Sequence, residues 1–170
     1  MNIHAPTTSP LTLLQLTLDP LPNLPVFQPL LDLYDSKRRG RLMPCWKDFK
    51  FSEFVGWHAR IALSRREDDD CRFRIFGSAF VELFDNDLTG ELLAASMVPE
   101  QKPEIMSHFK HCIDGPYMGL VTGRVPAEGR GFLGFEVIDL PLMDKDGEVS
   151  HFLHVCVAPG LGNLTPTIFG

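Results

Sequence analysis

The sequence predicts an α+β protein whose core is an antiparallel sheet accompanied by helices. Apolar and polar residues alternate in the middle of the chain and again in its last third, which is typical of half-buried strands. Two other segments, 26–38 and 100–114, repeat apolar residues at helical spacing. Asp146-Gly147 stands between two alternating runs and indicates a hairpin, so we expect neighbouring strands to run antiparallel.

The N-terminal part of the chain predicts an arm and then a helix. Residues 1–24 are rich in proline, which blocks helix formation and sheet pairing, so we expect an extended Pro-rich arm. A helical pattern of apolar residues follows, and Gly40 ends it. The predicted N-terminal helix therefore occupies residues 25–40.

The middle of the chain predicts a hairpin followed by helices. Residues 59–65 and 71–76 alternate apolar and polar side chains, and an acidic turn at 67–70 connects them. Gly77 interrupts the second strand, and short helical pieces follow. The segment 100–114 is the strongest helix in the sequence, because its apolar residues form one continuous face.

Three further strands are predicted in the C-terminal part. They cover residues 117–124, 131–142 and 149–158. Glycine and proline are frequent in residues 159–170, which we expect to form a loose tail. Residues 41–158 would then form the domain proper.

Composition and charge exclude several classes of function. The net charge of −6 argues against a nucleic-acid partner, because phosphate binding needs a concentrated positive field. No stretch approaches the ~18 consecutive apolar residues of a membrane-spanning helix, and the N-terminus does not resemble a secretory signal. The four cysteines are scattered, so neither a disulfide framework nor a zinc site is expected. We expect a cytoplasmic protein with no membrane partner.

Several short motifs resemble the PAS domain superfamily. Residues 141–149 are similar to the P-L-x-D-x-x-G-x-V turn that many PAS domains carry between their fourth and fifth strands. Residues 73–78 read F-R-I-F-G-S and residues 87–90 read D-L-T-G, like the two motifs of a family of small, mostly single-domain bacterial PAS-like proteins. Residues 40–44, followed by Asp48-Phe49, resemble the entry segment of the same family.

The resemblance covers residues 31–157 and implies a five-stranded antiparallel sheet in the spatial order 2-1-5-4-3, with helices on one face and an N-terminal helix. It also implies a small-ligand cavity between the sheet and the short helices. An alternative is that the same apolar side chains only fill the core. The expected ligand-binding residues are Ile61, Leu63, Phe73, Arg74, Ile75, Phe80, Phe84, Phe109, Met118, Leu120, Leu153 and Val155.

Histidines are considered separately, because some PAS sensors hold haem through a histidine on the long helix. By helical spacing, His108 lies at the margin of the apolar face of the predicted helix 100–114, so it is the candidate haem ligand. His151 and His154 lie on one predicted strand and project to opposite faces, so they cannot share a metal ion. No metal site is predicted.

Two other motifs receive a structural interpretation. Asp87 and Thr89 are interpreted as turn-building residues, with Gly90 supplying a positive φ angle. Cys71-Arg72-Phe73 shares letters with the reactive-cysteine motif of flavin-binding PAS domains. It lies on a predicted strand and not on a helix, so we expect no photoactive flavin site.

The expected function is a non-enzymatic sensor or regulatory module. It would bind a small apolar or amphipathic ligand or a partner protein, and signal through protein contact or as a homodimer formed by the helix that starts at Val26. Two alternatives stay open. One is a haem-binding gas or redox sensor that uses His108. The other is a small cup-shaped α+β enzyme acting on an apolar substrate, which would need an acid–base pair inside its cavity.

Overall fold

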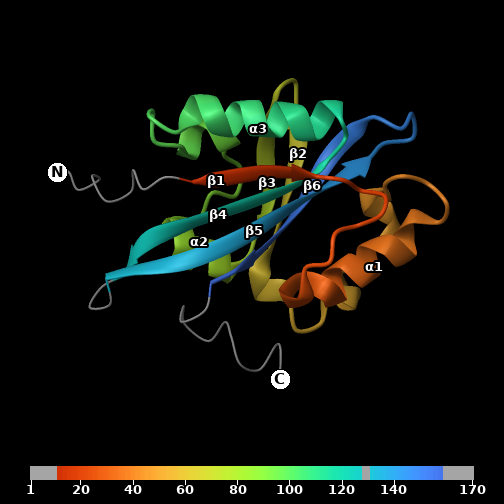
Figure 1. Ribbon diagram of the computed structural model, residues 1–170, viewed down its shortest axis with the longest axis horizontal. Helices are drawn as coiled ribbons and strands as arrows, with labels where there is room; N and C mark the ends of the chain where they lie inside the picture. The colour runs from red at the N-terminus through yellow and green to blue at the C-terminus, as the bar shows by residue number, and fades with distance from the viewer. Residues whose placement is uncertain (1–10, 128–130, 159–170) are drawn as a thin grey trace.

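A computed structural model describes residues 11–127 and 131–158 of the chain (Figure 1). These residues form a six-stranded antiparallel sheet in the order β1-β4-β5-β6-β2-β3. The PAS-like α+β architecture is thereby confirmed. The strands are β1 (Thr12–Leu16), β2 (Ile61–Glu67), β3 (Asp70–Phe76), β4 (Met118–Ala127), β5 (Gly131–Met143) and β6 (Val149–Val157).

The five predicted strands are β2 to β6, and counted in chain order they have the predicted spatial order 2-1-5-4-3. The prediction of five strands was wrong by one, because β1 forms within the predicted Pro-rich arm and pairs with β4 from Thr12↔Thr122 to Leu16↔Met118. No proline falls within β1, so each of its residues keeps the N–H group that sheet pairing requires. The first ten residues of the arm and the predicted tail 159–170 lie outside the described residues.

Within the described residues, three α-helices accompany the sheet: α1 (Gln28–Arg38), α2 (Ser78–Phe84) and α3 (Lys102–Asp114). The 3-10 turns of the described chain are Pro25–Phe27, Trp46–Asp48, Phe51–Phe54, His58–Arg60 and Leu93–Ser96. α1 ends where Arg39 and Gly40 take φ angles of 51° and 82°, in the left-handed region typical of helix C-termini. Along the described chain, no helix combines the length and apolar character needed to span a bilayer.

The D-L-T-G motif builds a turn, as interpreted from the sequence. The backbone N–H and the hydroxyl of Thr89 both donate to Asp87 Oδ1, at 3.0 and 2.6 Å. Gly90 takes a φ of 87°, which a residue with a side chain rarely adopts. These two hydrogen bonds lower the pKa of the exposed Asp87 carboxyl.

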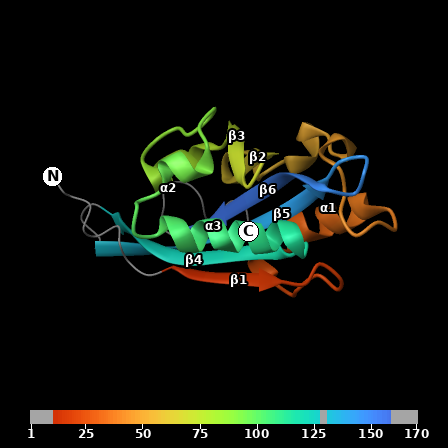
Figure 2. The same cartoon turned by 90° about the horizontal axis from the view of Figure 1, so that it is seen from above.

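The helix α3 covers one face of the sheet, which we call the α3 face. Residues that pair directly in antiparallel strands share a face, and neighbours along a strand alternate between faces. Gly119 pairs with Asp139, and Asp139 pairs with His154, so all three belong to one face. His108 of α3 lies 3.6 Å from Asp139, which places α3 over this face, and Figure 2 shows α3 running along β4.

The opposite face is apolar and buried where α1 packs. It carries Ile138, Leu140 and Leu142 of β5, each 0% exposed, which share a core cluster with the buried residues of α1. Tyr34 of α1 donates a hydrogen bond of 2.6 Å to the backbone oxygen of Pro141. In Figure 1, α3 lies above the strands and α1 below them.

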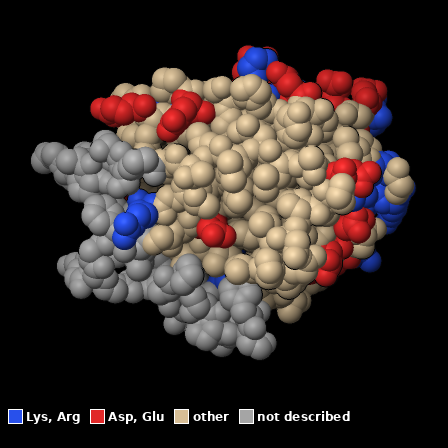
Figure 3. Space-filling view, in the orientation of Figure 1, with Lys and Arg blue, Asp and Glu red and all other residues tan. Residues whose placement is uncertain are grey.

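Charged side chains are unevenly distributed over the surface. Figure 3 shows them gathered toward the right-hand and upper edges of the view, whereas the middle carries few of them. Comparison with Figure 1 places that middle region over β1, β4 and β5. The sheet therefore presents a broad, weakly charged surface on this side.

Candidate functional site

The candidate site is a group of polar side chains buried under α3. Five polar or charged residues of the described chain are buried, and four of them meet: Ser64 of β2, His108 of α3, Asp139 of β5 and His154 of β6. Each is 0 to 3% exposed. The fifth, Arg60, lies 5.9 Å from the ring centroid of Trp57, and burial lowers its pKa. Buried polar groups are costly unless they are paired; here Ser64, His154 and Asp139 are joined by hydrogen bonds, and His108 lies 3.6 Å from the carboxylate.

His154 is the middle of this group. Its Nδ1 lies 2.6 Å from Asp139 Oδ1, and its Nε2 lies 2.8 Å from Ser64 Oγ. On the other side of the carboxylate, His108 Nε2 lies 3.6 Å from Asp139 Oδ2, and His108 Nδ1 lies 2.8 Å from Gln15 Nε2. The series Gln15–His108–Asp139–His154–Ser64, here called the buried polar chain, connects β1 to β2 under α3.

The pairing register explains why these side chains meet. Gln15 pairs with Gly119, Gly119 with Asp139, Asp139 with His154, and His154 with Ala62, so one row of the α3 face crosses five strands. A Cβ atom at Gly119 would lie 2.7 Å from His108 Nε2 and 2.9 Å from Asp139 Oδ2. A side chain at position 119 would therefore displace this pair, so glycine is favoured there.

The electrostatics of the site favour an ionised carboxylate. Burial alone raises the pKa of Asp139, but the interactions with His108 and His154 outweigh burial and bring it below its ordinary value. Asp139 Oδ2 accepts no hydrogen bond from the described residues, because His108 Nε2 is too distant. The site therefore holds a buried negative charge, and one of its two oxygens accepts no hydrogen bond from the described residues.

The nearby thiols are inert. Burial raises the pKa of Cys71 to about 12, and it raises the pKa of Cys112, whose sulfur lies 3.9 Å from His108 Nε2. Both stay protonated at neutral pH, whereas reactive cysteines are thiolates. Neither thiol has the properties of a nucleophile.

The order Ser64–His154–Asp139 is that of a hydrolase triad, in which histidine bonds to the serine through Nε2 and to the carboxylate through Nδ1. Accessibility distinguishes this group from an active site. Ser64 is 0% exposed, so a substrate cannot reach its hydroxyl while α3 is in place. In this closed form, the arrangement can hold a proton between His154 and Asp139 and orient both groups.

The predicted ligand-binding residues are not brought together around one cavity. By alternation, seven of the twelve lie on the face opposite α3: Ile61, Leu63, Ile75, Met118, Leu120, Leu153 and Val155. Phe84 is 48% exposed and Arg74 is exposed. Phe73, Phe80 and Phe109 remain close to the α3 face or the helices on it. The prediction placed these seven on the wrong face, because the apolar positions of each strand are not the ones that the helices on the α3 face cover.

His108 lies deeper than predicted. It was placed at the margin of the apolar face of its helix, but it is 2% exposed and both of its ring nitrogens face polar atoms. Asp139 and His154 were missed as site residues, although His154 was expected to point away from His151. One signal could have found Asp139: it is the acidic residue in the otherwise apolar run from Val137 to Met143.

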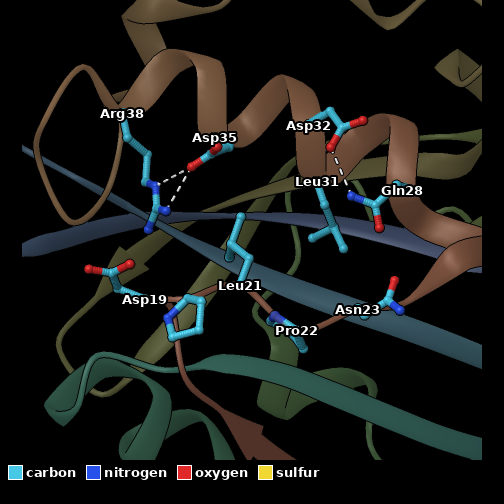
Figure 4. Close-up of a pocket in the computed structure, with 10 residues that line it drawn as sticks. Asp19, Leu21, Pro22, Asn23, Gln28, Leu31, Asp32, Asp35 and Arg38 are labelled. Atoms are coloured by element: carbon cyan, nitrogen blue, oxygen red, sulfur yellow. Dashed lines mark hydrogen bonds and ion pairs between the residues drawn. The ribbon is translucent and has the colours of Figure 1, made fainter.

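A pocket of about 400 Å³ lies elsewhere, between α1 and the segment after β1 (Figure 4). Figure 4 shows Arg38 paired with Asp35 and Gln28 paired with Asp32 on α1. Arg38 also donates to the backbone oxygen of Leu18 at 2.6 Å, which ties this segment to the helix. The charged groups of the pocket thus serve local structure. In residues 11–127 and 131–158, no group of three His, Cys, Asp or Glu side chains could hold a metal ion.

Comparison with known proteins defines the class. A family model described as PAS domain matches residues 25–157, so this chain belongs to the PAS domain family. PAS domains are typically sensory rather than catalytic. No curated protein matches the chain.

Solved structures show similarity at low identity. An RNA-binding light-oxygen-voltage receptor matches at 14% identity and a TM-score of 0.48, covering 88% of this chain and 38% of its own. The light-state structure of the blue-light photoreceptor Aureochrome1 LOV matches at 12% identity and a TM-score of 0.45, covering 64% of this chain and 88% of its own. A sensory box histidine kinase/response regulator from Burkholderia thailandensis matches at 12% identity and a TM-score of 0.42, covering 62% of this chain and 80% of its own. This chain thus spans well under half of the RNA-binding receptor.

Proposed function

We propose that this PAS domain is a non-enzymatic, cytoplasmic sensor module that binds a small amphipathic ligand on its α3 face. The observation that carries the proposal is the buried polar chain. Ionic groups in a core are costly to desolvate, and apolar residues of similar volume often give a more stable protein. A domain that keeps a carboxylate and two histidines under its main helix therefore supports a role beyond stability.

The surroundings of the polar chain favour a ligand with an apolar body and one hydrogen-bond donor. His154 is surrounded by aromatic rings, with the centroids of Phe73, Phe109 and Phe152 at 5.7, 6.0 and 6.0 Å. Asp139 Oδ2 supplies an acceptor that forms no hydrogen bond with the described residues, although His108 Nε2 lies 3.6 Å from it. Entry would require α3 and Phe109 to move, so the ligand would select an opened state of the domain. That shift is the proposed signal.

Native mass spectrometry of the protein as purified tests this proposal. We expect a retained small molecule on the wild type and its loss in Asp139→Asn, which keeps the shape of the side chain but removes its charge. The matched control is Asp87→Asn, at the exposed turn, which should keep the molecule. A wild type that carries no adduct and gains none from a library of amphipathic donors would refute ligand sensing on this face.

The output of the module is proposed to be a protein contact, including self-association. The predicted homodimer through α1 needs revision, because Leu30, Leu31 and Tyr34 are 0 to 2% exposed and pack within their own domain. The apolar stripe of α1 is thus unavailable to a second copy. No nucleic-acid partner is proposed, because the net charge is −6.

The haem alternative is specific enough to test. His108 would have to exchange its contacts with Asp139 and Gln15 for iron, which requires α3 to open. An absorption spectrum of the protein with added haemin decides: a Soret band that disappears in His108→Ala would support haem binding. A spectrum equal to that of free haemin would leave the small-ligand proposal.

A hydrolase is the second candidate, favoured by the triad order of Ser64, His154 and Asp139. An activity-based fluorophosphonate probe reacts with a serine that is activated by histidine and reached by solvent. We expect no labelling of Ser64 in the folded wild type, because Ser64 is fully buried. Labelling that is lost in both Ser64→Ala and His154→Gln would replace the sensor proposal with an enzymatic one.

A further inference from the structure

The two edges of the sheet differ in how they are protected. The outer edge of β3 is covered by the segment after the D-L-T-G turn: Phe73 N donates to Glu91 O at 3.0 Å, and Gly90 N donates to Phe73 O at 2.8 Å. Arg72 also forms a bridge with Leu92. For β1, the structure gives pairing with β4 alone within the described chain. β1 is therefore the open edge of the described sheet.

The sequence of β1 has none of the features that usually protect an open edge. Natural edge strands carry charges, prolines or bulges, which prevent pairing with other chains. Thr12–Leu16 reads T-L-L-Q-L, without charge or proline, and its register with β4 is continuous. Leu14 at its centre is 44% exposed. Such an edge is suited to pairing with a further strand.

We propose that the outer edge of β1 pairs antiparallel with β1 of a second copy, which gives a continuous sheet across a two-fold axis. Full overlap of Thr12–Leu16 with itself places Leu14 opposite Leu14 of the second copy and Thr12 opposite Leu16. The strand suits this occupant because Thr12–Leu16 carries no charge, so two copies of it can lie side by side without the repulsion that charged surfaces of two −6 chains would meet. The weakly charged surface over β1, β4 and β5 adjoins this edge (Figure 3).

The same geometry makes the assembly closed. Each copy uses its β1 edge once, and the other edge, at β3, is already covered by its own chain. An isologous contact of this kind stops at two copies and does not extend into a fibre. The inference rests on the proposed self-association and assigns it to one strand.

Charge at the centre of the contact tests the proposal. In Leu14→Lys, two ammonium groups would face each other across the axis, since Cβ atoms of directly opposed residues are ~5 Å apart. Leu14→Glu introduces the same repulsion with the opposite sign. The matched control is Leu42→Lys, because Leu42 is also 44% exposed but lies outside the sheet. Molar mass is measured by size-exclusion chromatography with light scattering over a concentration series.

We expect the wild type and Leu42→Lys to reach twice the chain mass of 19.1 kDa. Leu14→Lys and Leu14→Glu should each weaken the dimer by up to about fivefold, and an equimolar mixture of the two should recover it, because opposite charges then face each other. A dimeric Leu14→Lys would refute the β1 contact while leaving self-association intact. A wild type that stays monomeric would overturn both the β1 contact and self-association. It would not bear on ligand binding, which native mass spectrometry tests separately.

Discussion

Replacing His154 by leucine removes the middle of the buried polar chain, and the structure sets the size of the effect. The variant loses the contacts of 2.6 Å to Asp139 and 2.8 Å to Ser64. It leaves a carboxylate that is 2% exposed, with His108 Nε2 at 3.6 Å from Oδ2 as its remaining polar neighbour within this group. Removing one partner of a buried ion pair costs about 3–5 kcal/mol, because the other charge stays buried without compensation. We expect the free energy of unfolding to fall by about that amount.

Urea denaturation followed by far-UV circular dichroism measures this loss. In thermal scans, each kcal/mol corresponds to ~2–4 °C for a protein of this size, so the midpoint should fall by roughly 6–20 °C. His151→Leu is the matched control: His151 lies on the same strand but on the opposite face, and its substitution should change stability by less than about 1 kcal/mol.

The double variant Asp139→Leu/His154→Leu tests the cause of the loss. It removes the stranded charge together with its partner, so we expect it to be more stable than the sum of the two single effects predicts. Equal stability of His154→Leu and wild type would refute the reasoning. Strict additivity of the two single substitutions would show that the two residues do not act as a pair.

Three further outcomes follow from the same contacts. The pKa of Asp139 in the folded state lies below its ordinary value of 3.8. Its contribution to stability is therefore present above pH ~4 and is lost as the pH falls through the folded pKa. In acid titrations, the difference in unfolding free energy between wild type and Asp139→Asn should shrink over the same range. Gly119→Ala should cost about 1–3 kcal/mol by urea denaturation, whereas Gly134→Ala should be tolerated, because its nearest neighbour would lie 3.9 Å away. Tyr34→Phe should lower the free energy of unfolding by about 1 kcal/mol, because the Pro141 carbonyl then loses the hydrogen bond from the Tyr34 hydroxyl. Unchanged stability would show that the carbonyl finds another donor.

Local patterns were sufficient to predict most elements of this domain. Period-two alternation indicated β2 to β6, helical spacing indicated α1 and α3, and Asp146-Gly147 indicated the turn between β5 and β6. The family motifs then supplied the order of the strands. β1 was missed because the prolines around it dominated the interpretation, although pairing depends only on the residues that form the ladder.

The site was harder to predict for a physical reason. Alternation shows that the two faces of a strand differ, but it does not show which face a distant helix will cover. Apolar Leu63 and Leu153 were predicted to lie on the helix-covered face, whereas that face carries Ser64 and His154. Only the tertiary arrangement brings His108 from α3 to Asp139 on β5, since 30 intervening residues separate them.

Gln15 connects the two proposals, because it is the member of the buried polar chain that lies on β1, with its Nε2 2.8 Å from His108 Nδ1. A hydrogen bond of this kind contributes about 1 kcal/mol, so its loss should raise local opening of β1 about fivefold. The measurement is the ratio of the hydrogen-exchange rates of the β1 amides to those of the β3 amides. This ratio should rise in Gln15→Leu and in His108→Leu.

The double variant Gln15→Leu/His108→Leu should exchange no faster in β1 than the faster single variant, because both substitutions remove the same contact. Thr12→Ala, also on β1 but on the opposite face, is the control and should leave the ratio between β1 and β3 unchanged. If Gln15→Leu likewise leaves that ratio unchanged, the polar chain does not hold β1. A change on the α3 face would then have no route to the sheet edge through this residue.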